Sequence, residues 1–438
     1  MPFVTSNSPQ EMANRFPLEI YELFIDELSG SREFLQSSSL VSYAWLFRCR
    51  THLFRRFRLR YVPPSGDVGD KDYLYCWYPT KPLHLNVSDA GAEGLCPLVE
   101  LLKVQQIRQS IRELSFIEGD VIDSSRYMMH SFGKSLFELA ASMAFPKLHS
   151  LDISFRASGP RDCCPGVITM QEIMRINPTL ERLCVSSLYL DNHCLQTFLR
   201  SFRLCSRLST IQLRCITYTT HAKSSLSLCS SVASEMDTVK LHRTFRPTIR
   251  TLSLSDVNPD LVEVLFSPAK PDVFKMADLN SLAIDCSDLE GKYRTLEKNK
   301  GFRIIERHAS SLQHLLLLKY PRNIDHAVYR ALFSTTLPHL STLEMHFVNV
   351  HDGSFRHVLE KLSSLHSPLS EFHIGLKYGP RTALTPPVDR SITKFAQSLR
   401  SLRRVRFQVT QMIDEFRCEH LPQAALILQL EIVQVEGM

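Results

Sequence analysis

Apolar residues recur along most of this chain in the order apolar, two residues, apolar, one residue, apolar. Successive copies begin roughly thirty residues apart, which is a period typical of repeat proteins. The last two apolar positions of each copy are two residues apart, so both lie on one face of an extended segment. The ten copies are Ile111-Leu114-Phe116, Leu148-Leu151-Ile153, Leu180-Leu183-Val185, Leu208-Ile211-Leu213, Ile249-Leu252-Leu254, Leu279-Leu282-Ile284, Leu312-Leu315-Leu317, Leu340-Leu343-Met345, Leu369-Phe372-Ile374 and Leu402-Val405-Phe407.

Segments with helical periodicity lie between these predicted strands. Examples are Leu195-Phe198-Leu199-Phe202, Val358-Leu359-Leu362 and Ile392-Phe395-Ala396-Leu399. Each unit therefore reads as strand, loop and helix. One unit cannot bury both its strand face and its helix stripe, whereas stacked units bury both in a continuous core. The alternative is an ordinary α/β sheet whose strands happen to be rich in leucine.

This pattern resembles the leucine-rich repeat. The best copy is Cys205–Thr217, CSRLSTIQLRCIT, which is close to a cysteine-containing subtype common in F-box proteins. Most other copies lack the Asn or Cys that follows the strand in that family. The resemblance implies an irregular, leucine-rich-repeat-like α/β solenoid, or horseshoe, over residues 83–438.

The N-terminal stretch from Phe16 to Phe54 has a different pattern, with three short apolar-periodic segments. Phe16-Pro17 opens the first, because proline is tolerated where a helix begins. Ile20, Leu23, Phe24 and Leu28 follow at helical spacing, and Gly30 ends the segment. Three helices of this size bury little surface and are marginal alone. Apolar surface left over on such a unit suits docking better than chemistry.

This stretch resembles an F-box. The family's opening Leu-Pro-x-Glu appears as Phe16-Pro17-Leu18-Glu19, and its Val-Cys-x-x-Trp core appears as Val41-Ser42-Tyr43-Ala44-Trp45. Leu53-Phe54 matches the closing apolar pair. The chain departs from the family at Phe16, at Ser42 and at Ser38, where an apolar residue is usual. The alternative is a helical cap on a larger domain.

The two resemblances together imply the substrate-receptor subunit of a cullin-based ubiquitin ligase, without catalytic residues of its own. Its partners would be the ligase adaptor, through it a cullin, and a protein substrate. The alternatives are a repeat scaffold unrelated to ubiquitin and a basic nucleic-acid-binding protein. By resemblance, the adaptor-binding residues are Pro17, Ile20, Phe24, Leu28, Val41 and Trp45.

The expected domain organisation follows from these two regions. We expect a loose tail over residues 1–12, the helical module over 13–60 and a linker over 61–82, which contains Pro63-Pro64-Ser65-Gly66. In a parallel repeat sheet the residues between and just after the buried ones face the opposite side. A substrate would meet that face, and its candidate residues there are Arg214, Asp285, Glu344, His346, His373 and Arg406.

The composition limits which partners, metals and cofactors we expect for this chain. Charged residues make up 22%, the net charge is +6 and the pI is about 8.7, which does not require a nucleic-acid partner. Arginines cluster at 48–60 and at 400–406, but without the interleaved aromatic residues that stack on bases. No secretory signal, membrane span, nucleotide-binding loop or Cys-x-x-Cys pair occurs, so we expect no metal, no cofactor and no membrane contact. The twelve cysteines are then reduced thiols in the cytoplasm or nucleus.

Overall fold

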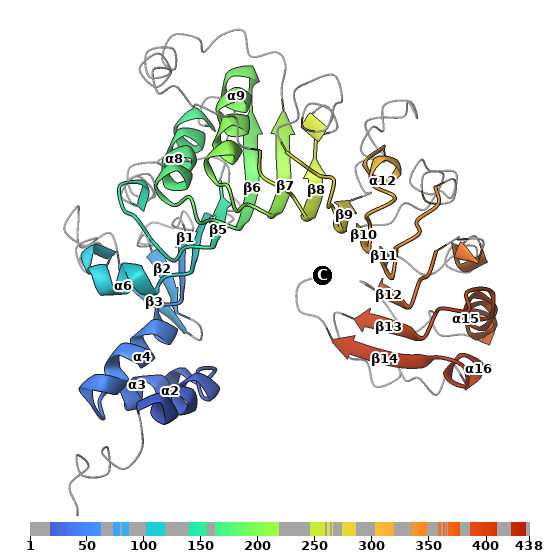
Figure 1. Cartoon of the computed structure of the whole chain (residues 1–438), viewed down its shortest axis with the longest axis horizontal. Coiled ribbons are helices and arrows are strands. Elements are labelled where there is room, and N and C mark those ends of the chain that lie inside the picture. The colour runs from blue at the N-terminus through green and yellow to red at the C-terminus, as the bar shows by residue number, and fades with distance from the viewer. Residues whose placement is uncertain are drawn as a thin grey trace, which may run out of the picture. The chain divides into compact units, whose positions relative to one another are not determined.

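The structure, a computed structural model, is mixed α/β (Figure 1). It describes residues 18–62, 73–78, 81–86, 102–118, 140–155, 163–218, 246–258, 261, 262, 265, 274–285, 303–318, 332, 335–347, 358–360, 362, 363, 365, 367–376, 386–409 and 422–434.

The chain divides into two compact units. The first comprises Met1–Leu188, Asn192–Arg207 and Lys223–Val239, and the second comprises Tyr189–Asp191, Leu208–Ala222 and Lys240–Met438.

The first unit begins with three helices and continues into a sheet. Its elements are α2 (Leu18–Glu27), α3 (Arg32–Ser39), α4 (Tyr43–Leu53), β1 (Arg56–Val62), β2 (Tyr73–Tyr78), β3 (Lys81–Asn86), α6 (Gln105–Ser110), β4 (Glu113–Glu118), β5 (Ser150–Ser154), α8 (Cys163–Ile176), β6 (Arg182–Leu190), α9 (Asn192–Ser201) and η2 (Phe202–Leu204). Strands β1, β4, β5 and β6 are parallel, in the order β6-β5-β4-β1. Strand β2 pairs antiparallel with β1, and β3 pairs antiparallel with β2.

The second unit is a run of parallel strands, each paired with the next along the chain. Its strands are β7 (Thr210–Tyr218), β8 (Thr251–Val257), β9 (Ser281–Asp285), β10 (His314–Leu318), β11 (Thr342–Phe347), β12 (Glu371–Leu376), β13 (Arg404–Val409) and β14 (Gln429–Gln434). Its helices are α12 (Arg303–Arg307), α15 (Pro386–Ser398) and α16 (Pro422–Ala425). Consecutive parallel strands need a crossover between them, and α12, α15 and α16 lie in the crossovers that lead to β10, β13 and β14.

The core of the second unit is a ladder of apolar side chains in register. The residues that occupy one level of neighbouring strands are Ile211, Leu252, Leu282, Leu315, Leu343, Phe372 and Val405, and all are buried. The ring of Phe372 packs edge-on against Phe395 of α15, with centroids 5.3 Å apart, so α15 covers this face of the sheet. The predicted register, with the second and third apolar positions of each copy buried, is confirmed in β7 to β13.

The entry to each strand also repeats. The carbonyl oxygen of Ser341 accepts hydrogen bonds from the N–H groups of Ser370 at 2.9 Å and Glu371 at 3.0 Å. One carbonyl thus holds the first amide of the next strand and the amide just before it. The same arrangement occurs in both units, with the acceptors Arg55, Arg112, His149, Ser209, Arg250, Asn280, Gln313, Ser341 and Ser370. Backbone groups are obligatory hydrogen-bonding partners, so this repeated bond fixes the stagger of successive strands.

All ten predicted strands are present, as β4 to β13. Strand β14 was not predicted. Residues 383–388, with Pro386-Pro387, would be expected from sequence to form an exposed loop, but α15 begins at Pro386, where two prolines fit the first helical turn. Residues 61–82 include the end of β1 and all of β2, so part of the expected linker is sheet.

Candidate functional site

The N-terminal helices form a small module with its own core. Ile25 of α2, Leu35 of α3 and Cys49 of α4 are buried together, and Phe34, Trp45 and Leu53 pack against them. The hydroxyls of Ser31 and Ser42 accept from the amides of Phe34 and Trp45, each at 3.3 Å, and so cap α3 and α4. Such caps satisfy amides that otherwise lack a partner at the start of a helix.

An acidic residue in α2 links this helix to α4. The Asp26 carboxylate accepts from Arg48 Nε at 2.7 Å and from a second guanidinium nitrogen of the same residue, and His52 Nε2 lies 2.7 Å from it. The hydrogen bonds from Arg48 lower the pKa of Asp26 to about 2, with His52 acting in the same direction against the effect of burial. The bidentate geometry orients the two helices as well as joining them.

Helix α2 turns Ile25 toward the module core, and its other apolar residues therefore face outward. Ile20, Leu23, Phe24 and Leu28 are all exposed, Leu23 by 62% and Phe24 by 54%. We call these four residues the α2 patch. Scattered single apolar residues on a surface are normal, whereas a stripe of four on one short helix is a candidate interaction surface.

The residues predicted to bind the adaptor have different positions. Ile20, Phe24 and Leu28 belong to the α2 patch, and Val41 is 57% exposed before α4. Trp45 is only partly exposed and packs against the module core, where its ring lies 5.2 Å from that of Tyr21. Pro17 lies outside the described residues. Ser38, where the F-box pattern has an apolar residue, is buried.

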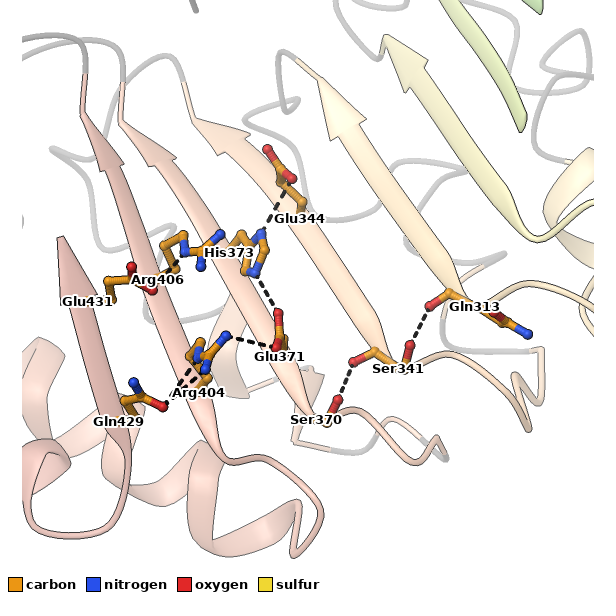
Figure 2. A network of polar contacts seen from close by, with 10 residues as sticks. All are labelled: Gln313, Ser341, Glu344, Ser370, Glu371, His373, Arg404, Arg406, Gln429 and Glu431. Carbon is orange, nitrogen blue, oxygen red and sulfur yellow. Dashed lines mark hydrogen bonds and ion pairs between the residues drawn. The ribbon is translucent and has the colours of Figure 1, made fainter. Parts of the chain in front are cut away.

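A second candidate surface is the face of the second unit opposite its apolar ladder. Glu344, His373, Arg406 and Glu431 stand side by side at one level of β11 to β14. Figure 2 shows these side chains on the same face of the sheet, together with Glu371 and Arg404 one level below. The predicted residues Glu344, His373 and Arg406 are therefore neighbours.

Ion pairs connect this cluster across the strands. His373 Nδ1 lies 3.5 Å from Glu344, and its Nε2 lies 3.1 Å from Glu371, so the ring bridges two carboxylates. His346 Nε2 lies 2.6 Å from Glu344. Burial raises the pKa of Glu344, but the hydrogen bonds from His346 and His373 outweigh it and bring the pKa to about 2. Glu344 is therefore a carboxylate at neutral pH.

The other two predicted substrate-binding residues do not join this cluster. Arg214 is exposed on β7, where it contacts the side-chain amide of Gln212 on the same strand. The backbone of Asp285 belongs to β9, but its side chain is outside the described part of the structure. Arg214 shares a level with Ser255 of β8.

Three residues of the cluster were not predicted. Glu371 and Arg404 come directly before the buried Phe372 and Val405, and Arg404 Nη1 donates to Glu371 at 3.1 Å. Glu431, on the unpredicted strand β14, accepts from Arg406 at 2.9 Å. Strand alternation places the residue before a buried position on the open face as well, which is the signal that could have identified Glu371 and Arg404.

Several arginines of the two basic clusters have acidic partners. Arg48 pairs with Asp26, Arg56 with Glu113 at 3.0 Å, Arg404 with Glu371 and Arg406 with Glu431. A guanidinium already paired with a carboxylate must give up that pair to bind a phosphate. These pairs weigh against the nucleic-acid alternative.

Within the described residues, His, Cys, Asp and Glu side chains form no group of three that could hold a metal ion. None of the described helices combines the length and hydrophobicity that a bilayer crossing requires. Among the described cysteines, Cys49 and Cys205 are buried free thiols, whereas Cys194 is disulfide-bonded. The expectation of reduced thiols is therefore wrong at Cys194.

The chain was also compared with known proteins. No protein-family model matches it, and no curated protein matches it either.

Proposed function

We propose that this protein is the substrate-receptor subunit of a cullin-based ubiquitin ligase. Its helical module would act as an F-box that docks to the ligase adaptor. The strands that follow would form a leucine-rich-repeat-like horseshoe that holds a protein substrate. The receptor would have no catalytic residues or cofactor, and it would work in the cytoplasm or nucleus.

The observation that carries this proposal is the α2 patch. The module has its own core of Ile25, Leu35 and Cys49 and is capped and ion-paired, yet the α2 patch stays exposed. Of the patch residues, Phe24 also has a ring contact inside the module, edge-on to Phe34 with centroids 5.9 Å apart. Exposing Leu23 and Phe24 to water is unfavourable by about 25 cal/mol per Å² of apolar surface. A partner that covers the patch recovers this free energy, and an adaptor is such a partner.

The test is binding of the purified full chain to a purified adaptor subunit. We expect Ile20→Asp combined with Phe24→Asp to abolish binding, because a charge at the centre of an apolar interface is left without water. Both residues are exposed, but the Phe24 ring also contacts Phe34, so circular dichroism is used to verify that the double variant is folded. Leu426→Asp is the matched control, since Leu426 is 86% exposed on the second unit. Full binding by the folded double variant would overturn the assignment.

The open face of the second unit is where we propose that substrate binds. Its cluster of carboxylates, guanidinium groups and histidines has mixed charge, which gives selectivity among protein segments rather than attraction to any polyanion. Charge reversal at Arg404 and Arg406 should change the proteins that co-purify without altering adaptor binding. An unchanged set of co-purifying proteins would place the substrate site elsewhere.

A further inference from the structure

Helix α4 has two faces with different surroundings. Trp45, Arg48, Cys49 and His52 face the module core and Asp26. Tyr43, Leu46, Phe47 and Arg50 recur at three- and four-residue spacing and therefore lie on the other side of the helix. Tyr43 is 87% exposed and Phe47 60% exposed.

The second face of α4 borders a pocket. Tyr43, Leu46, Phe47 and Arg50 line it from α4, and Gln106, Ile107 and Ser110 line it from α6. Ile107 is buried and supplies an apolar wall. The Ser110 hydroxyl donates to the Gln106 carbonyl at 2.9 Å, so it is already satisfied.

The size of the pocket limits what it can hold. Its volume is about 190 Å³. Sites for drug-sized ligands and cofactors are usually about 300–1,000 Å³. The pocket is therefore large enough for one aromatic or branched aliphatic group, which Ile107, Leu46 and Phe47 would surround.

Arg50 determines the charge beside that group. Arg48, two residues earlier and therefore on the other face, pairs with Asp26, whereas Arg50 has no ion-pair partner among the described residues. None of the described residues that line the pocket is acidic. An apolar group accompanied by a carboxylate would fill the pocket and pair with the guanidinium, which has donors in a geometry that suits a carboxylate.

We propose that the pocket between α4 and α6 binds an acidic segment of a partner protein, with one large apolar side chain inserted next to a carboxylate. This site is separate from the α2 patch, because its residues lie on different helices. It does not depend on the proposed ligase function.

Two small probes test this inference on the full chain. The first is 3-phenylpropionate, which carries an aromatic ring and a carboxylate, and the second is 3-phenylpropylamine, which has the ring with an opposite charge. Binding is followed by NMR at the Ile107 methyl group, whose signal is identified by its loss in Ile107→Val. We expect saturable binding of the carboxylate probe in the millimolar range, as is usual for fragments. The amine should bind about tenfold more weakly, as expected for loss of one charged hydrogen bond.

Three variants identify the groups responsible. Arg50→Gln should remove the preference for the carboxylate, and Phe47→Ala should weaken both probes. Arg55→Gln is the matched control, because Arg55 is an exposed arginine just beyond the helix and outside the pocket lining. Equal affinity for the two probes in the unmodified chain, or an unchanged preference in Arg50→Gln, would overturn the proposal. So would an Ile107 signal that does not respond to 3-phenylpropionate.

Discussion

Arg404 of β13 donates a hydrogen bond to the carboxylate of Glu371 in β12 across 3.1 Å, although the two residues are 33 positions apart in the sequence. Each side chain is 33% exposed. Ion pairs of this exposure contribute about 0.2–1 kcal/mol, because water and salt screen them. A double-mutant cycle of Arg404→Ala and Glu371→Ala, followed by urea unfolding, should give a coupling free energy in that range. A coupling above about 2 kcal/mol would mean that the pair is more deeply buried than the structure shows.

Truncating a residue of the apolar ladder should lower the free energy of unfolding much more than removing the Arg404–Glu371 ion pair. Leu343 is fully buried between Leu315 and Phe372, so Leu343→Ala should lower the free energy of unfolding by about 2–5 kcal/mol through lost burial and a residual cavity. Leu316→Ala, one residue from the ladder on the open face, is the control and should cost less. Equal losses at the two positions would show that the strand register is wrong.

The buried side-chain amide of Asn177 should be needed for the stability of the first unit. Its Oδ1 accepts from the Phe145 amide at 2.7 Å, and its Nδ2 donates to the Ile173 carbonyl at 2.8 Å. Asn177→Ala leaves both backbone groups buried without these partners, and each such group costs about 1–3 kcal/mol. We expect the variant to unfold at lower urea concentration. Asn177→Asp keeps the acceptor but loses the donor and buries a charge, so it should not rescue the stability.

The low pKa of Glu344 predicts how the second unit responds to acid. The folded-state pKa is about 2, below the ordinary value of about 4.3 for glutamate in an unfolded chain. The stabilisation from the ionised carboxylate is therefore fully present above about pH 4.3 and is lost as the pH falls toward 2. The difference in unfolding free energy between the unmodified chain and Glu344→Gln should shrink between pH 5 and pH 2.5. A difference that is constant over this range would contradict the pairing with His346 and His373.

The sequence predicted the strands better than the surfaces. The spacing of Leu343 and Met345 repeats in every predicted strand, and stacking makes each copy support the next, so irregular gaps did not hide the pattern. Strand β14 also fits this spacing, as Ile427-Leu430-Ile432, so the sequence contained the signal for a strand that was not predicted.

The orientation of α2 could not be predicted from periodicity alone. Ile20, Phe24 and Leu28 form one apolar stripe, and Ile25 begins another, so the helix has two candidate faces for the core. The choice depends on contacts with Leu35 and Cys49, which come from other helices. The α4–α6 pocket was missed for a similar reason, since more than fifty residues separate Phe47 from Ile107 and no pattern connects them.

The backbone of the helical module continues directly into the sheet. Only Phe54 and Arg55 separate α4 from β1, and the Arg55 carbonyl accepts from Arg112 and Glu113 at the start of β4. A truncation at residue 60 would therefore cut through β1, remove the buried Phe57 and leave one edge of β4 without its hydrogen-bonding neighbour. The shortened protein would be prone to edge-to-edge aggregation, so loss of binding after this truncation would not identify the binding residues. Point substitutions on the α2 patch avoid that ambiguity because β1 stays in place.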